Sequence, residues 1–303
     1  MELKIINQTR GRKDKQDESS IICNYSDRVI DLKTIIINSL NLTISASRIG
    51  LFFEDLSQKD SKVFLARNDK PLRDYGLHQG MTIVVKDLGP QIGWRTTYII
   101  EYLGPFLMIF YYFFFHLGAK NSNNTQKLGF IMSTFHYGKR ILESIFVHEF
   151  SNSTMPLKNL FINCAHYWVI YGLICGYSLF NSNYKEPGYN VFMMVILTFL
   201  FFSAEIKNLK CHLILKDLKN KNKGEKGIPS GEGFEFVSCA NYFWEFLSWV
   251  FFSVLVNSIP FYLFTFFGFY IMRIWAIKKH KNYLATFGER YPKERKAFIP
   301  FLI

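Results

Sequence analysis

One segment of the sequence combines ionisable side chains with the spacing of a helix. Four of them stand at positions i, i+3, i+4 and i+7: His136, Lys139, Arg140 and Glu143. This spacing places all four on one helix face. Ionisable groups inside a membrane face the bundle interior and by default mark a functional site. Two cations against one acid leave positive charge over, which suits a phosphate-bearing ligand. The alternative is mutual neutralisation, in which Lys139 or Arg140 pairs with Glu143 and only holds the helix in place.

Further polar residues gather where one apolar segment ends and the next begins: Asn208, Lys210 and His212, then Asn241, Tyr242 and Glu245. Asn241 and Glu245 could also be a helix-start cap and its neighbour, and Tyr242 an aromatic residue of the membrane interface. The sequence contains no GxGxxG after a strand and no Walker, GxSxG or HExxH motif. Rossmann-type nucleotide binding, ATPase chemistry and the common hydrolases are therefore disfavoured. A nucleotide, if one binds, is expected within the helical bundle.

Apolar segments of membrane length must position these residues. The chain has 303 residues, of which 49% are hydrophobic and 18% aromatic, and this composition excludes disorder and collagen. Six segments are long enough to span a bilayer: 98–117, 128–147, 159–181, 190–206, 240–257 and 259–277. The second is the weakest, because the ionisable stripe interrupts it. We predict an α-helical polytopic membrane bundle of about six transmembrane helices.

The charge distribution predicts the orientation of the bundle. Residues 1–90 hold 14 Lys+Arg and 12 Asp+Glu, which leaves 22 basic and 12 acidic residues of the total 36 and 24 for the remainder. The basic surplus gathers in an expected loop at 207–226 and in the tail after residue 277. By the positive-inside rule, both face the cytosol together with the two termini. Charges beside membrane spans indicate anionic headgroups as partners, and no nucleic acid.

Residues 1–88 read as a small cytosolic α+β domain, and residues 89–303 as the membrane domain. Strands are expected at 3–6, 19–24, 49–53, 62–65 and 82–85, with a helix capped by Ser26 after the second strand. The order ββαβββ resembles the ubiquitin-like β-grasp fold. The domain continues through Leu88 and Gly89 without a terminal Gly-Gly pair, so a docking or stabilising role is expected rather than conjugation.

The sequence predicts no disulfide or metal site and no signal peptide. The five cysteines are scattered without CxxC or His-bracketed spacing, so neither a disulfide scaffold nor a metal site is predicted. No signal peptide is predicted either, because charges at Arg10 and Arg12 precede any apolar run of sufficient length.

Several separated motifs, in order, resemble one family across essentially the whole chain: HYGKRILE at 136–143, VHEFS at 147–151, TMPLKN at 154–159, VSCANY at 237–242 and the ending YP…IPFLI. These motifs are similar to those of the very-long-chain trans-2-enoyl-CoA reductases, which belong to the steroid 5α-reductase superfamily. An N-terminal ubiquitin-like domain ahead of the bundle is the arrangement of that branch. The sequence of residues 207–234 is more similar to the steroid branch of the superfamily than to the enoyl-CoA branch. A steroid or polyprenol reductase is therefore the alternative, and a non-catalytic scaffold that displays the ubiquitin-like domain is a third.

The resemblance implies an enzyme of the endoplasmic reticulum membrane that reduces trans-2-enoyl-CoA to the saturated acyl-CoA with NADPH. This reaction is the last step of the very-long-chain fatty-acid elongation cycle, and the other enzymes of that cycle are implied partners. The resemblance makes Tyr242 the proton donor, and Lys139 the cation that stabilises the phenolate or binds phosphate. It also implies that Glu101 lies on the substrate side. Five further residues are implied to contact the cofactor: Arg140, Asn208, Asn241, His280 and Tyr283. The basic surplus favours NADPH over NADH, since a 2′-phosphate needs a cation.

Overall fold

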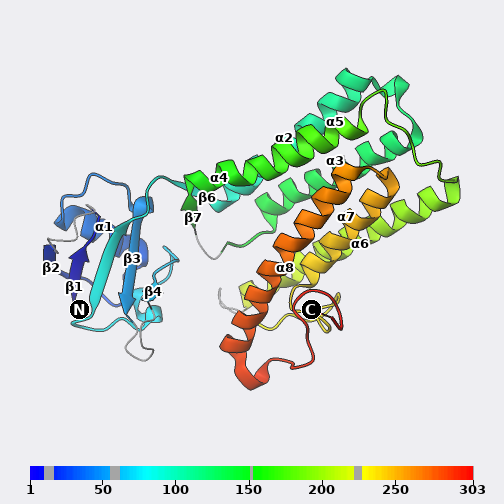
Figure 1. The fold of residues 1–303 in the computed structure, drawn as a ribbon. Helices are drawn as coiled ribbons and strands as arrows, with labels where there is room; N and C mark the ends of the chain where they lie inside the picture. Colours follow the sequence, from blue (N-terminus) through cyan, green and yellow to red (C-terminus); the bar gives the residue numbers. More distant parts are fainter. Residues whose placement is uncertain (10–16, 55–61, 151–152, 222–226, 303) are drawn as a thin grey trace. The chain divides into compact units, whose positions relative to one another are not determined.

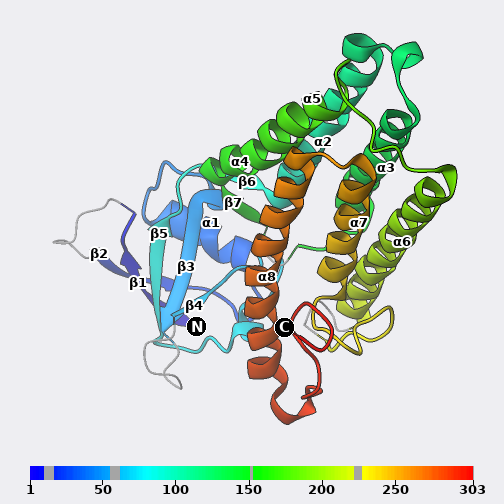
Figure 2. The ribbon, with the colours of Figure 1, turned by 45° about the vertical axis from the view of Figure 1, so that its right-hand side comes forward.

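The computed structural model describes residues 1–9, 17–54, 62–150, 153–221 and 227–302. Packing divides the chain into two units, Met1–Thr97 with Phe150–Phe161 and Tyr98–Glu149 with Ile162–Ile303. The first contains a small sheet with a helix, and the second is a bundle of long helices (Figures 1 and 2). The predicted domain division between residues 88 and 89 stays a prediction.

The first unit is built on a five-stranded mixed sheet. Its strands are β1 (Glu2–Asn7), β2 (Asp17–Ile22), β3 (Ile49–Glu54), β4 (Lys62–Phe64) and β5 (Thr82–Asp87). They lie in the order β2-β1-β5-β3-β4, with β1 and β5 parallel and the other pairs antiparallel. The buried side chains of Leu3 and Ile5 alternate along β1 and share one core with Leu32 of α1 (Val29–Ser39). This strand order with one crossover helix is the ubiquitin-like β-grasp topology, so the predicted fold class is confirmed.

The start of α1 differs from the prediction. Its N-cap is Arg28, and the backbone N–H of Arg28 donates to the carboxylate of Asp31 at 2.9 Å. The prediction that Ser26 caps this helix is therefore wrong. The preceding residues form a turn instead, in which the backbone N–H of Asn24 donates to Asp27 Oδ2 at 2.7 Å. The acid in the first turn also suits the positive end of the helix dipole.

Lys33 lies among the apolar residues of α1 and is only 4% exposed. Burial lowers the pKa of Lys33 to about 8. An unfolded lysine keeps its proton up to a pKa of about 10.4, so between these values the unfolded chain binds more protons and stability rises with pH. We expect Lys33→Met to stabilise this unit by about 1–3 kcal/mol at pH 7 and by much less at pH 10.

Pulse proteolysis in urea, applied to the full chain at the two pH values, measures this effect. The matched control is Lys4→Met, which removes the same charge from an exposed position on β1. A stabilisation by Lys33→Met that is equal at both pH values would contradict the prediction.

A second sheet, which the sequence analysis did not predict, joins two distant segments. Strands β6 (Gln91–Gly93) and β7 (Thr154–Pro156) pair antiparallel, with Gln91 opposite Pro156. Each strand runs directly into a helix, β6 into α2 (Trp94–Tyr111) and β7 into α4 (Leu157–Cys164). Strands of three residues are too short for alternation to reveal.

The second unit has helices at all six predicted spans. The first is α2, which continues as the π-helical segment η3 (Tyr112–Leu117), and the second is α3 (Asn124–Phe146). The third consists of α4, the π-helical segment η5 (Ala165–Cys175) and α5 (Gly176–Leu179). The last three are α6 (Val191–Lys221), α7 (Ala240–Val256) and α8 (Ile259–Phe287).

Four helical stretches among the described residues are long and apolar enough to cross a membrane: Trp94–Leu117, Leu157–Leu179, Val191–Lys221 and Ile259–Arg290. Helix α7 is apolar but shorter, with 17 residues. Helix α3 has the length, but its ionisable stripe lowers its hydropathy, as the sequence analysis anticipated. The membrane bundle is thus confirmed.

The expected loop at 207–226 is wrong over most of its length, because α6 continues to Lys221 and residues 222–226 lie outside the described part. Helix α8 likewise continues to Phe287, past the expected end at residue 277. Hydropathy detects only the apolar part of a helix, whereas backbone hydrogen bonding continues into the polar part. Both extensions position basic residues close to the site described next.

Candidate active site

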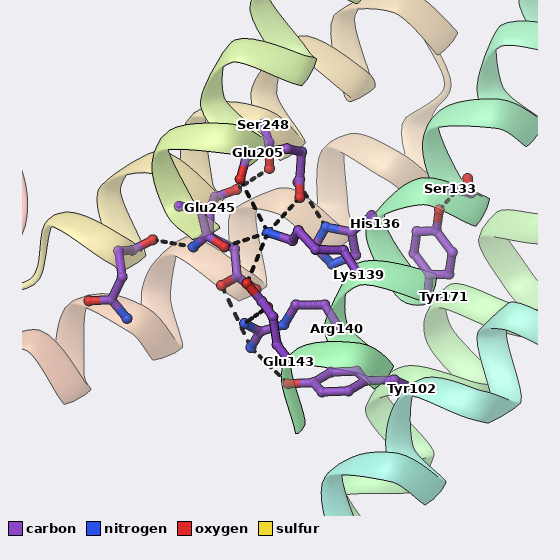
Figure 3. Close-up of polar contacts among 12 residues, drawn as sticks. Tyr102, Ser133, His136, Lys139, Arg140, Glu143, Tyr171, Glu205, Glu245 and Ser248 are labelled. Carbon is purple, nitrogen blue, oxygen red and sulfur yellow. Dashed lines mark hydrogen bonds and ion pairs between the residues drawn. The ribbon is translucent and has the colours of Figure 1, made fainter. Parts of the chain in front are cut away.

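The ionisable stripe lies on one buried face of α3. His136, Lys139 and Arg140 are all at most 8% exposed, and Glu143 is equally buried. Figure 3 shows these side chains directed together towards glutamates of α6 and α7. The prediction that these four side chains share one helix face is therefore confirmed.

Glu205 of α6 holds the first half of the stripe. Its Oε2 lies 2.8 Å from Lys139 Nζ, and its Oε1 lies 2.8 Å from His136 Nδ1. Lys139 also donates to Asn208 Oδ1 at 2.5 Å. The ammonium of Lys139 is thus fixed by one carboxylate and one amide of the same helix.

Arg140 and Glu143 form the second half of the stripe. Arg140 Nη1 lies 3.2 Å from Glu143 Oε2, while Nη2 donates to Tyr102 Oη at 2.8 Å and lies 3.8 Å from Glu245 Oε2. The other oxygen of Glu143 lies 2.9 Å from His212 Nδ1. Three helices besides α3 therefore contribute a partner to this half.

The charge balance of the cluster differs from the prediction. Lys139 and Arg140 do pair with Glu143, as the alternative of mutual neutralisation required. In the described part of the chain, Glu205 and Glu245 bring the carboxylates to three against two cations. The positive surplus expected at the stripe is therefore wrong, because both glutamates come from helices distant in sequence.

A hydrogen-bond chain links the cluster to the start of α7. Asn208 Nδ2 donates to the backbone oxygen of Asn241 at 2.8 Å, and Asn208 Oδ1 accepts from Lys139. The N-cap of α7 is Cys239, so Asn241 as a helix cap is wrong. The structure thus brings together four of the predicted residues: Lys139, Arg140, Asn208 and Asn241.

Tyr242 follows directly and is half-buried. The ammonium of Lys279 on α8 lies 4.9 Å from the centroid of its ring, and the ring of Trp275 lies 6.4 Å away. The described contacts of Lys139 are instead with Glu143, Glu205 and Asn208. Lys279 is therefore a cation at Tyr242 that the sequence analysis missed, since it counted that lysine only as part of the basic tail.

His280 and Tyr283 meet the C-terminal tail beside the start of α7. Ser238 Oγ lies 2.6 Å from both His280 Nδ1 and Tyr291 Oη. The rings of Tyr283 and Tyr291 stack at 5.4 Å with 9° between their planes. The tail is fixed by the backbone N–H of Ser238, which donates to Lys296 O at 2.8 Å. The two predicted residues are thus part of one ordered group.

Buried guanidinium groups test whether the site fits a phosphate-bearing cofactor. Arg295 donates through Nη1 to Pro229 O at 2.9 Å, and its guanidinium lies 5.6 Å from the ring of Tyr291. Among the described residues, neither Arg295 Nε nor Arg140 Nε has a hydrogen-bond partner, although both are buried. Buried donors normally have partners, so phosphate oxygens would complete both. The residues present therefore fit such a group.

A turn with unusual backbone geometry connects α6 to α7. Glu232 has φ of 52° between two glycines with positive φ, and its carboxylate lies 3.3 Å from Lys207 and 3.0 Å from Lys210. Its backbone oxygen accepts from Trp244 Nε1 at 2.8 Å. The flanking glycines allow the turn, because positive φ is strained for other residues. Lys210 is thus paired with the carboxylate of Glu232.

Among the described residues, the hydrogen-bond partner of Glu101 is outside the cluster. Its carboxylate is buried in α2 and accepts from Asn163 Nδ2 at 2.7 Å. Its neighbour Tyr102 is the residue that contacts Arg140. A substrate-side role for Glu101 stays a prediction.

Glu143, His148 and His212 offer ligand atoms within 4.8 Å of one another. Arg140 and Lys139 both approach Glu143, at 3.2 and 3.8 Å, and their charges disfavour a metal cation there. The absence of a metal from the site stays a prediction.

Comparisons with known proteins identify the relatives of this chain. A family model described as 3-oxo-5-alpha-steroid 4-dehydrogenase matches residues 153–303. A Schizosaccharomyces pombe protein described as an enoyl reductase is 44% identical over 243 residues, which cover 77% of this chain and 80% of that protein. The very-long-chain enoyl-CoA reductase of Dictyostelium discoideum is 36% identical over 309 residues and the full length of both. A Caenorhabditis elegans protein also named for that activity is 38% identical over 253 residues, covering 78% and 80%.

Proposed function

Because the chain belongs to the enoyl-CoA reductases of the steroid 5α-reductase superfamily, we propose that it reduces trans-2-enoyl-CoA to saturated acyl-CoA with NADPH. We assign this reaction to the last step of very-long-chain fatty-acid elongation. The observation that carries the proposal is the convergence of Lys139, Arg140, Asn208 and Asn241 at the start of α7. Tyr242 follows Asn241 directly and lies beside Lys279. A scaffold that only displays a ubiquitin-like domain does not need this cluster.

Tyr242 holds the proton that the α-carbon of the substrate must receive. NADPH, when bound, supplies the hydride for the β-carbon. A phenol is a proton donor at neutral pH and becomes a phenolate after transfer. The ammonium of Lys279, 4.9 Å from the ring centroid, stabilises that negative charge. Proton donor and counter-charge thus come from adjacent helices, α7 and α8.

The residues that would hold the cofactor surround the start of α7. Arg140 and Arg295 provide buried donors for phosphate, and Arg295 is our candidate partner for a 2′-phosphate. The side chain of Asn208 fixes the backbone of Asn241 beside them. His280 and Tyr283 close the same group from α8. This assignment supports NADPH over NADH, since NADH lacks the additional phosphate.

We place the protein in the endoplasmic reticulum membrane with both termini in the cytosol, where the other elongation enzymes would be its partners. Four long apolar helices support the membrane location. Basic residues near the end of α6 support the orientation. Lys216 donates to the backbone oxygen of Phe146 and Lys219 to that of Glu149, so the charges of α6 lie beside the end of α3.

The experiment that tests the proposal is NADPH oxidation by the purified full chain in detergent. A long-chain trans-2-enoyl-CoA, a 4-ene-3-keto steroid and a polyprenal are compared, with NADH as the control cofactor. We expect turnover with the acyl-CoA and a clear preference for NADPH. Turnover with the steroid or polyprenal alone would move the chain to the steroid branch, whose family model matches residues 153–303. No turnover with any of the three would favour the scaffold.

A further inference from the structure

The ubiquitin-like unit contains a pocket that no step of the reaction uses. Its volume is about 280 Å³. It lies at the end of the sheet where β3 begins and β4 ends, and the two-stranded sheet of β6 and β7 forms its other side. The stacked rings of Phe52 and Phe64, with centroids 4.8 Å apart, form one apolar wall. The pocket therefore combines an aromatic wall with the polar backbone of two sheets.

Lys33 is the cation of this pocket. It lines the cavity from α1, and its side chain makes no hydrogen bond or ion pair with any residue that the structure describes. Fully buried lysines are rare unless they are paired. The pKa of about 8 that burial gives Lys33 leaves most of its charge in place at pH 7. The pocket thus holds a positive charge without a partner in the described chain.

The other described lining residues are suited to an anion. None of them is acidic, and several carry side-chain donors: Ser47, Ser153, Thr154 and Asn159. The amide of Gln91 already donates to the backbone oxygens of Leu88 and Gly89. Ser153 Oγ already accepts from Asn68 Nδ2 at 3.3 Å, so its own proton is available to a ligand. A lysine with hydroxyl and amide donors is an arrangement that binds phosphate.

The chain around the pocket also leads directly into the membrane. Trp94 lines the pocket and is the first residue of the first candidate span, and Asn159 lies in the first turn of the second, which begins at Leu157. Arg95 and Lys158 are exposed in these first turns. Tryptophan and basic residues at the ends of spans are typical of the headgroup layer. The covalent structure therefore holds the pocket near that layer.

We propose that this pocket binds the phosphate ester of a membrane lipid headgroup, with Lys33 as its counter-charge. The phosphate displaces no existing ion pair of Lys33. The two strands β6 and β7 connect the bound headgroup to the starts of α2 and α4. A soluble phosphate ester, such as that of CoA, has the same chemistry, so the experiment must distinguish the two sources.

The test is calorimetric titration of the purified full chain, in a neutral maltoside detergent, with dihexanoyl phosphatidic acid. We expect Lys33→Met to weaken binding by about 10- to 100-fold, the loss of one charge-assisted hydrogen bond. Lys33→Arg should retain most of the affinity. The matched control Lys4→Met removes an exposed charge from the same unit and should bind as the wild type does.

Adenosine 3′,5′-bisphosphate serves as the second probe. Lipid binding that this probe does not displace identifies the headgroup as the source. Displacement that also depends on Lys33 retains the site but assigns it to a soluble phosphate ester. Equal affinities for Lys33→Met and Lys4→Met, or no binding of either probe, would overturn the proposal. The readout is binding and not turnover, so the result is independent of whether the reductase assignment holds.

Discussion

Replacement of Tyr242 by phenylalanine is expected to lower kcat by about 10²- to 10⁴-fold, which is the usual contribution of a positioned general acid. The ring of Tyr242 lies beside Lys279 and Trp275, and its hydroxyl is hydrogen-bonded to the side chain of Lys279. Phenylalanine keeps that ring, so the fold and cofactor binding should be unchanged. The measurement is kcat with a saturating long-chain enoyl-CoA, together with the Kd of NADPH by fluorescence.

Two controls separate proton donation from a packing defect. Tyr270→Phe removes a hydroxyl from an exposed tyrosine of α8 and should leave kcat unchanged. Lys279→Met should lower kcat in the wild type but have little further effect in Tyr242→Phe, because no phenolate then forms. A full-rate Tyr242→Phe enzyme would exclude Tyr242 as the proton donor.

Local patterns predicted the elements of the fold well. Alternation in the first strand and short apolar runs in the others predicted all five strands of the larger sheet. The spacing of Lys139 and Glu143 predicted one helix face, and that face is buried. These features depend on neighbours in sequence, which a period of two or of 3.6 residues reveals. The ends of α6 and α8 were misjudged, because the transition from apolar to polar residues does not coincide with the end of the helix.

Tertiary partners could not be predicted in the same way. Glu205 is 66 residues from Lys139, and no spacing rule connects them. Lys279 meets Tyr242 only because α8 packs beside α7. No sequence pattern marks Lys33, because the pocket beside it forms only where β6 and β7, distant in sequence, pair with each other. In each case the identity of a residue was informative, but its partner was fixed by packing between distant segments.

The second large effect concerns stability. Lys139→Met leaves the carboxylate of Glu205, which is 1% exposed, without the ammonium at 2.8 Å. Among the described residues, Glu205 then keeps only the imidazole of His136 at 2.8 Å. Removing one partner of a buried ion pair destabilises by about 3–5 kcal/mol, which corresponds to a fall in Tm of roughly 6–20 °C for a unit of this size. Thermal unfolding of the full chain in detergent measures this change.

The same substitution at Lys207 provides the comparison that isolates burial. Lys207 pairs with Glu232 at 3.3 Å, but its side chain is 43% exposed, so Lys207→Met should change the unfolding free energy by about 0–1 kcal/mol. Adding Glu205→Gln to Lys139→Met removes the buried negative charge of Glu205 and should restore most of the lost stability, because an amide needs no counter-charge. If the double variant is as unstable as Lys139→Met, packing around Lys139 and not its charge determines the effect. If the double variant is stable but does not turn over, Lys139 has a role in the reaction beyond neutralising Glu205, and the structural and chemical roles of this lysine are then separated.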